Sequence, residues 1–178
     1  NIALFQPLTL VSIVGYYNEN RSLQRLNEIT CQHPYLSINR NIKKTAIAIY
    51  LAEFLNNILK HEEPNQGLFG YVKDSLIRFD SLETGYENFH LNFIINCAKY
   101  LGFAPENAEY LFSSVPGNVT STKAGVLDKL MEPSYPNDIL LDNNTRIELL
   151  EMIITYYRLH IEGFKQMNSS GILHDVLN

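Results

Sequence analysis

Apolar residues lie on nearly every side of a predicted helix over residues 41–60, NIKKTAIAIYLAEFLNNILK. The segment contains neither Gly nor Pro, and its Ala, Leu, Glu and Lys residues favour helix. A helix that is apolar all round is usually covered by neighbours on several faces. We therefore predict that residues 41–60 form the central helix of the fold.

Further segments have apolar positions near helical spacing and predict helices over residues 66–82, 88–101 and 144–159, with a last short helix over 172–177. Residues 103–142 are the least regular, because Pro and Gly recur there. We expect an irregular insertion that opens with a short helix after Pro105. Its apolar residues should hold it in place, and they are Leu111, Phe112, Val126, Leu127 and Leu130.

Two strand patterns precede the helices, over residues 8–14 and 23–31, with a turn at residues 18–20. They predict a β-hairpin. Since two strands alone are only marginally stable in water, they either pack on the helices or end a β-domain that begins upstream, and we favour the second. Strands followed by helices indicate an α+β fold that is mainly α.

The 178 residues suffice for one substantial domain, and 46% of them are hydrophobic. The net charge of −5 argues against a protein that coats nucleic acid unspecifically. Residues 1–60, however, carry six basic and three acidic residues, so a polyanion would meet the first third of the chain. No apolar run is long enough to span a membrane. We expect a cytoplasmic protein whose two cysteines, Cys31 and Cys97, are buried and inert.

The residue types that carry catalysis or bind metals do not converge. The sequence contains no Gly-rich phosphate loop and no HExxH pattern. His61, Glu62 and Glu63 are interpreted as a polar helix end rather than a metal site. His90 and Cys97 share one helical face, and we expect a surface histidine and a buried cysteine rather than a catalytic pair. Glu148 and Glu151, three residues apart, are expected on a solvated face. The sequence predicts a protein that is not an enzyme.

Two groups of residues favour binding. Arg40, Lys43 and Lys44 stand at the start of the predicted central helix, where they form either a solvated helix end or a site for phosphate or for a partner's carboxylates. Aromatic and basic residues also mix around the end of the helix over 144–159. There the tyrosines either stack on bases or pack in the core with their hydroxyls outward. This second group consists of Tyr156, Tyr157, Arg158, His160, Phe164 and Lys165.

Several segments, taken in order, resemble the RecO family of bacterial DNA-repair and recombination-mediator proteins. Residues 4–10 (LFQPLTL) and 23–29 (LQRLNEI) resemble later strands of that family's N-terminal OB domain. Residues 47–55 (IAIYLAEFL) are similar to its central helix. Residues 93–105, ending in YLGFAP, resemble the helix that ends in Leu-Gly-Tyr-x-Pro, and residues 156–177 resemble the closing segment.

The resemblance implies the end of an OB fold over residues 1–36 and a helical domain over 37–178. It implies binding of single- and double-stranded DNA, strand annealing, and docking on RecR and on the acidic tail of single-stranded DNA-binding protein, which together help to load RecA. Many members carry four zinc-binding cysteines after the Gly-aromatic-Ala-Pro turn, but residues 106–142 hold no Cys, so we predict no metal and no cofactor. The expected DNA- or partner-binding residues are Arg21, Arg25, Arg40, Lys43, Lys44, Arg158 and Lys165. The alternative is a helical adaptor domain that binds only protein and has no role with nucleic acid.

Overall fold

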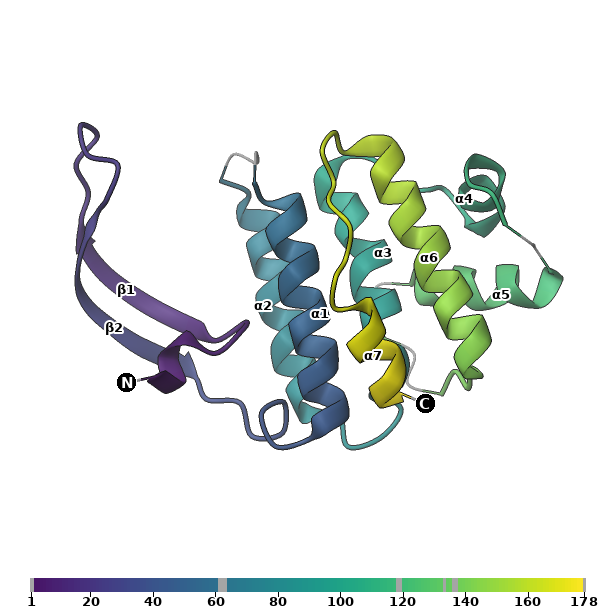
Figure 1. Ribbon diagram of the computed structural model, residues 1–178, viewed down its shortest axis with the longest axis horizontal. Helices are drawn as coiled ribbons and strands as arrows, with labels where there is room; N and C mark the ends of the chain where they lie inside the picture. The colour runs from purple at the N-terminus through teal and green to yellow at the C-terminus, as the bar shows by residue number, and fades with distance from the viewer. Residues whose placement is uncertain (1, 61–63, 118–119, 133, 136–137, 178) are drawn as a thin grey trace.

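The computed structural model describes residues 2–60, 64–117, 120–132, 134–135 and 138–177, and in this part of the chain two strands precede seven α-helices (Figure 1). The α+β, mainly α class is confirmed. The elements are η1 (Ile2–Phe5), β1 (Leu10–Tyr16), β2 (Arg25–His33), α1 (Ile42–Ile58), α2 (Gln66–Ser81), η2 (Tyr86–Asn88), α3 (Phe89–Leu101), α4 (Ala108–Ser114), α5 (Ser121–Leu130), α6 (Asn143–His160) and α7 (Ser170–Leu177).

The helix at the centre of the fold is α3. Every residue from 89 to 98 is buried, and α3 packs against α1, α2, α5 and α6. The helix predicted over residues 41–60 is therefore confirmed, but the prediction that it is the central helix of the fold is wrong. Ile42, Ile49 and Leu59 of the segment 41–60 are exposed, so neighbouring elements do not bury this helix on all sides although its apolar residues lie on all sides.

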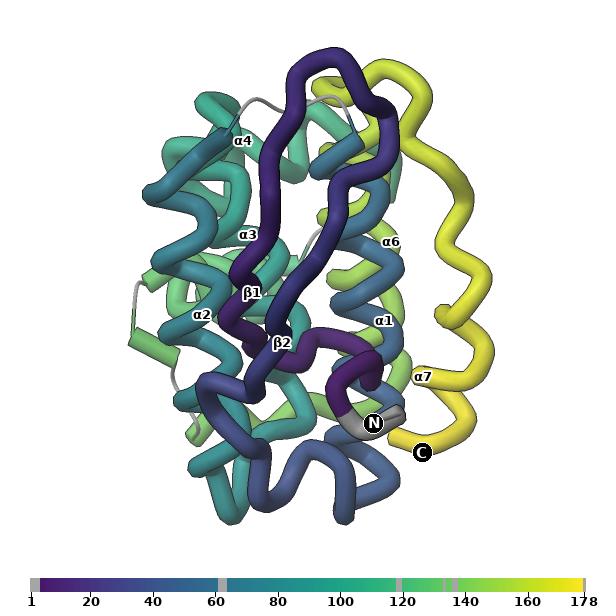
Figure 2. Tube along the Cα trace, turned by 90° about the vertical axis from the view of Figure 1, so that its left-hand side faces the viewer, coloured from purple at the N-terminus to yellow at the C-terminus, as the bar shows by residue number. Residues whose placement is uncertain are grey.

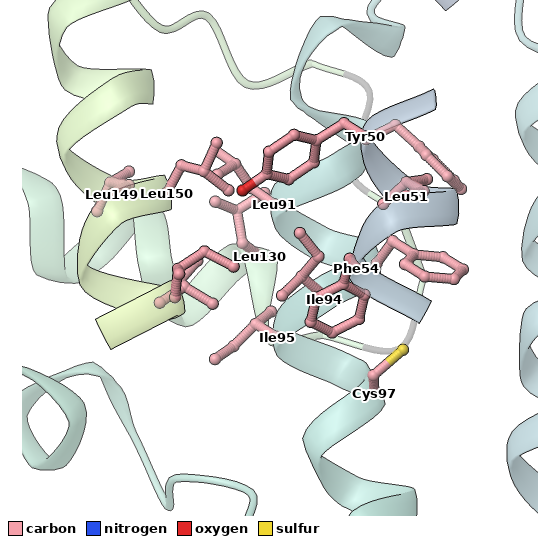
Figure 3. Close-up of a cluster of buried hydrophobic side chains, with 14 of the residues drawn as sticks. Tyr50, Leu51, Phe54, Leu91, Ile94, Ile95, Cys97, Leu130, Leu149 and Leu150 are labelled. Carbon is pink, nitrogen blue, oxygen red and sulfur yellow. The ribbon is translucent and has the colours of Figure 1, made fainter. Parts of the chain in front are cut away.

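The core lies where α1, α3, α5 and α6 meet (Figure 3). Tyr50 and Phe54 come from α1 and face Leu91 and Ile94 of α3, and Leu150 completes the cluster from α6. All are almost completely buried. At about 25 cal/mol per Å² of apolar surface, burial of this kind is the main stabilising term of the fold.

Side-chain caps explain why the helices begin where they do. Asn41 accepts hydrogen bonds from the backbone N–H groups of Lys43 and Lys44, and Asp142 caps α6 through Thr145. Asn and Asp are favoured at this position because their oxygens satisfy N–H groups that lack a partner within the helix. The predicted helices over 66–82, 88–101, 144–159 and 172–177 are confirmed to within about two residues.

The region predicted as an irregular insertion is more regular than expected. It contains two helices, α4 and α5, and only the first was predicted. The missed helix is capped by Thr120 and buries Leu127 and Leu130. The expectation that apolar residues hold the region is confirmed, since Leu111 and Phe112 are buried as well.

The two strands form the predicted antiparallel hairpin, whose register runs from Leu10↔His33 to Tyr16↔Arg25. We call residues 10–33 the hairpin arm and residues 38–177 the helical body. The arm stands at the side of the helical body, next to α1 and α2 (Figures 1 and 2). Most of its residues are exposed, so the arm does not share the core. The idea that it ends a larger β-domain remains a prediction.

Among the described residues, no helix combines the length and apolar character that crossing a membrane requires.

Candidate nucleic-acid and partner-binding surfaces

A carboxylate of α2 helps to anchor the hairpin arm to the helical body. Asp80, at the end of α2, accepts hydrogen bonds from the backbone N–H groups of Leu36 (2.8 Å), Ser37 (2.8 Å) and Ile38 (2.9 Å). Burial would raise the pKa of the Asp80 carboxyl, but these hydrogen bonds outweigh burial and hold the pKa below its usual value. The charged carboxylate thus fixes the segment that links the arm to α1.

Lys44 also stabilises this connection. We call the connection, which consists of Asp80, Lys44 and residues 36–38, the joint. Its ammonium donates to the carbonyl oxygens of Phe79 (2.8 Å), Asp80 (3.0 Å) and Leu82 (2.5 Å) and to the hydroxyl of Ser37 (2.6 Å). A cation that binds the last carbonyls of a helix satisfies groups left without partners there. Burial lowers the pKa of Lys44, and Asp80 opposes that shift.

The expectation that Lys44 belongs to an accessible basic group is therefore wrong, because the side chain is only 1% exposed. A signal in the sequence was available. Lys44 lies in helical register with Ala48, Leu51 and Leu55, all buried on the inner face of α1. Of its two predicted companions, Arg40 is exposed and Lys43 is half-buried, and both remain candidates for binding.

A cavity of about 330 Å³ lies between α6, α1 and the segment leading into α7. Arg158 lines it together with the apolar side chains of Leu150, Ile154 and Met167. Glu151 also stands at this cavity, so its lining carries both signs of charge. We call it the Arg158 cavity.

Lys165, the other predicted cation in this region, stands beside Lys60. The pKa of Lys60 is lowered chiefly by the nearby ammonium of Lys165, because two like charges close together disfavour the protonated form. The two residues are far apart in the sequence, and nothing in the local pattern indicates that they meet. Lys60 is therefore a candidate that the sequence analysis missed.

One wall of the Arg158 cavity is held by Glu53. Its carboxylate accepts hydrogen bonds from the backbone N–H groups of Asn168 (2.7 Å) and Ser169 (2.8 Å) and from both of their side chains. Burial would raise the pKa of Glu53, but these hydrogen bonds keep the pKa below its usual value. The chain next to Met167 and Ser170, which line the cavity, is thereby fixed in place.

The aromatic residues at the end of α6 belong to the core. Tyr156 and Tyr157 are buried, and their hydroxyls donate to the carbonyl oxygens of Phe103 (2.9 Å) and Ile94 (2.7 Å). His160 stacks on Phe103 with ring centroids 4.8 Å apart. The tyrosines therefore pack in the core, which excludes base stacking on these two rings, but the expectation that their hydroxyls point outward is wrong, because both hydroxyls bond to backbone carbonyls of the fold.

The remaining predicted cations, Arg21 and Arg25, are exposed on the hairpin arm. They lie on a different part of the molecule from Arg158 and Lys165, near the free end of the hairpin (Figure 1). The seven predicted residues therefore do not form one site. They divide among the arm, the start of α1 and the end of α6, and Lys44 leaves the set.

Two expectations about reactive residues need correction. His90 is completely buried rather than on the surface, and burial together with the charges of Arg146 and His174 lowers its pKa to about 3. Cys97 is buried as predicted, but the expectation for Cys31 is wrong, because Cys31 is exposed on the hairpin arm. Burial raises the pKa of the Cys97 thiol, which keeps it protonated and unreactive.

Within the described ranges, no three His, Cys, Asp or Glu side chains lie close enough together to bind a metal ion. His61, Glu62 and Glu63 lie outside those ranges. Glu148 and Glu151 are exposed as predicted, and Glu148 forms a salt bridge with Lys123.

Comparisons with known proteins bear on these surfaces. The family model described as "Recombination protein O C terminal" matches residues 39–111, from just before α1 into α4. The DNA repair protein RecO of Bacteroides fragilis is 33% identical over 193 residues, covering 98% of this chain and 80% of that protein. The chain belongs to the RecO family.

Other relatives agree. The DNA repair protein RecO of Azobacteroides pseudotrichonymphae is 31% identical, with 99% of this chain and 80% of that protein covered. That of Flavobacterium psychrophilum is 29% identical over the same shares. The resemblance found in the sequence is therefore confirmed. No solved structure matches the chain significantly.

Proposed function

We propose that this chain acts in DNA repair and recombination as a mediator that works by binding and not by catalysis. It holds DNA, anneals complementary strands, and docks on RecR and on the acidic tail of single-stranded DNA-binding protein, which helps to load RecA in the cytoplasm. Membership of the RecO family supports this role. The separation of an exposed arm from a helical body that contains a cavity also supports it, because the two ligands would bind at different places.

The observation that carries the protein-docking half of the proposal is the Arg158 cavity. An acidic tail that ends in an apolar residue requires an apolar pocket with a cation at its edge. Leu150, Ile154 and Met167 provide the apolar wall, and Arg158 provides the cation. Lys165 and Lys60, at the same end of the body, add positive charge for the rest of the tail.

The test is fluorescence anisotropy of a labelled peptide with that chemistry, titrated with the chain at low and moderate salt. We expect binding that weakens about tenfold on Arg158→Glu, since a hydrogen bond to a charged group contributes about 1.5–3 kcal/mol. Removing the terminal apolar residue of the peptide should weaken binding as well. Lys129→Glu reverses an exposed lysine on α5 and is the matched control. Equal affinities for both variants would refute docking in this cavity.

The second candidate is an adaptor that binds protein only. The observation in its favour is the charge of the hairpin arm, where Arg21 and Arg25 are balanced by Glu19 and Glu28. A labelled oligonucleotide, titrated in parallel with the peptide, separates the candidates. The mediator binds both ligands, whereas the adaptor binds the peptide alone.

A further inference from the structure

A second, smaller cavity lies between α3, α6 and α7, next to the Arg158 cavity (Figure 1). Its volume is about 10 Å³, close to the smallest space that holds one water molecule or one ion of similar size. Leu150 and His174 line both cavities. Because His90 of α3 forms the inner end of the smaller cavity's lining, we call it the His90 cavity.

The lining of the His90 cavity is half apolar and half polar. Every polar residue in it carries an N–H group, and the lining contains no carboxylate among the described residues. A site that offers only donors to its occupant fits an acceptor, and an anion is the strongest acceptor. The polar lining residues are His90, Asn143, Arg146 and His174.

Two imidazole rings bring unpartnered nitrogen atoms to this cavity. His90 is completely buried. The Nε2 atoms of His90 and His174 are both buried and have no hydrogen-bond partner within the described part of the chain. A buried polar atom without a partner destabilises the fold, so each of these atoms favours an occupant that it can bond.

Arg146 contributes a buried positive charge. The residue is only 8% exposed. Its guanidinium donates to three neutral oxygens, which belong to Asn88, Asn143 and Leu141. These bonds use three of the five N–H groups of a guanidinium and do not neutralise its charge. A buried cation whose bonded partners are neutral is stabilised further by an anion nearby.

The charge of Arg146 also decides against a metal ion. Neutral imidazole nitrogens alone would suit a metal, but a guanidinium in the same lining repels a cation. Its field reaches the ring of His90, whose pKa is lowered by burial and then by the charge of Arg146. Burial lowers the pKa of Arg146 itself, and Glu87 and Asp142 oppose that shift from outside the cavity.

We propose that the His90 cavity binds a single halide ion, which is chloride under ordinary conditions, through the N–H groups of His90, His174 and Arg146. The volume admits one atom, so phosphate, sulfate and carboxylate groups are too large. Chloride is preferred to fluoride, because a weakly hydrated anion loses less on entering a half-apolar cavity. The ion links α7 to α3 and α6, and it thereby stabilises the helix that follows one wall of the Arg158 cavity.

The experiment measures the chlorine NMR linewidth of dilute sodium chloride with the whole chain, since exchange with a bound ion broadens the line. His90→Leu and His174→Leu each remove an N–H group, and each should reduce the broadening about tenfold. His160→Leu changes a histidine at the opposite end of α6 and should leave the broadening unchanged. Sodium bromide should compete with chloride for the site, whereas sodium sulfate should not.

A second measurement covers the case in which a variant folds poorly. Crystals of the unchanged chain grown in sodium bromide should show an anomalous peak between the Nε2 atoms of His90 and His174. In urea unfolding, chloride at about ten times its dissociation constant should favour the folded state about tenfold more in the unchanged chain than in His174→Leu.

Three results would overturn the halide site. They are equal broadening in all variants, competition by sulfate as strong as by bromide, and a divalent metal bound to the purified chain in a manner that His174→Leu abolishes. The site requires neither DNA nor a protein partner. Its failure would therefore leave the proposed function unchanged, and a failure of the proposed function would leave the site unchanged.

Discussion

In the helical body, α3 has ten consecutive buried residues, whereas in the hairpin arm Ile13, Val14 and Leu26 are each more than half exposed. Both regions are rich in apolar residues. The body uses them to exclude water from a shared core, and the arm leaves them accessible while its backbone is paired. The contrast indicates that the helical body is stabilised by its own core and that the arm contributes little to this core.

The largest test of this contrast compares equivalent truncations in the two regions. Leu91→Ala in α3 should lower the free energy of unfolding by about 2–5 kcal/mol, because it leaves a cavity in a fully buried site. Ile13→Ala on the arm should change it by about 0.5 kcal/mol or less. Urea unfolding followed by circular dichroism measures both. A large loss from Ile13→Ala would mean that the arm is covered.

The joint is the next test, because it belongs to both regions. Lys44→Met removes the donor for the three carbonyl oxygens of Phe79, Asp80 and Leu82, and should cost about 3 kcal/mol. The neighbouring Lys43→Met, half-buried on the same turn, should cost about 0.5 kcal/mol or less. Urea unfolding of the two variants gives the answer. Similar values would contradict the assignment of Lys44 to the joint.

The third test is a pH dependence of the free energy of unfolding that involves the helical body alone. The pKa of His90 is about 3 in the fold and about 6.5 when unfolded, so the unfolded chain binds more protons below pH 6.5. Its contribution to stability is complete above about pH 6.5 and is lost as the pH falls towards 3, by up to about 1.4 kcal/mol per pH unit. His90→Gln should flatten the pH dependence of the urea-derived free energy of unfolding between pH ~7 and pH ~5. If the free energy of unfolding of the His90→Gln variant depends on pH as strongly as that of the unchanged chain, His90 is not the cause of this dependence.

The sequence predicts the helices and the hairpin well, because periodicity and caps are local signals. Residues such as Asn41 and Asp142 mark helix starts through bonds within the next few residues. Which helix lies at the centre is not a local property, because nothing in residues 41–60 shows that Ile42 and Ile49 face solvent.

The candidate sites are harder to predict from the sequence, because they too depend on contacts between residues that are distant in the chain. The aromatic and basic residues around Arg158 indicate a binding site, but the Arg158 cavity depends on a segment that Glu53 binds from 115 residues away in sequence. The pairing of Lys60 with Lys165 is equally distant. The charge of Lys44 favours a surface position, whereas its helical register with Ala48, Leu51 and Leu55 favours the buried position that the structure shows. Distant pairs are set by tertiary packing, which a single sequence does not display.

The joint at Asp80 has a consequence for simultaneous binding. Three backbone N–H groups held by one carboxylate give the arm and the body a short, fixed connection instead of a flexible tether. Under the proposed function, a protein tail that is tethered to the same DNA strand would reach the Arg158 cavity as a second, intramolecular contact, and a rigid connection sets the distance that such a tether has to span. Asp80 would then influence avidity, although it touches neither ligand.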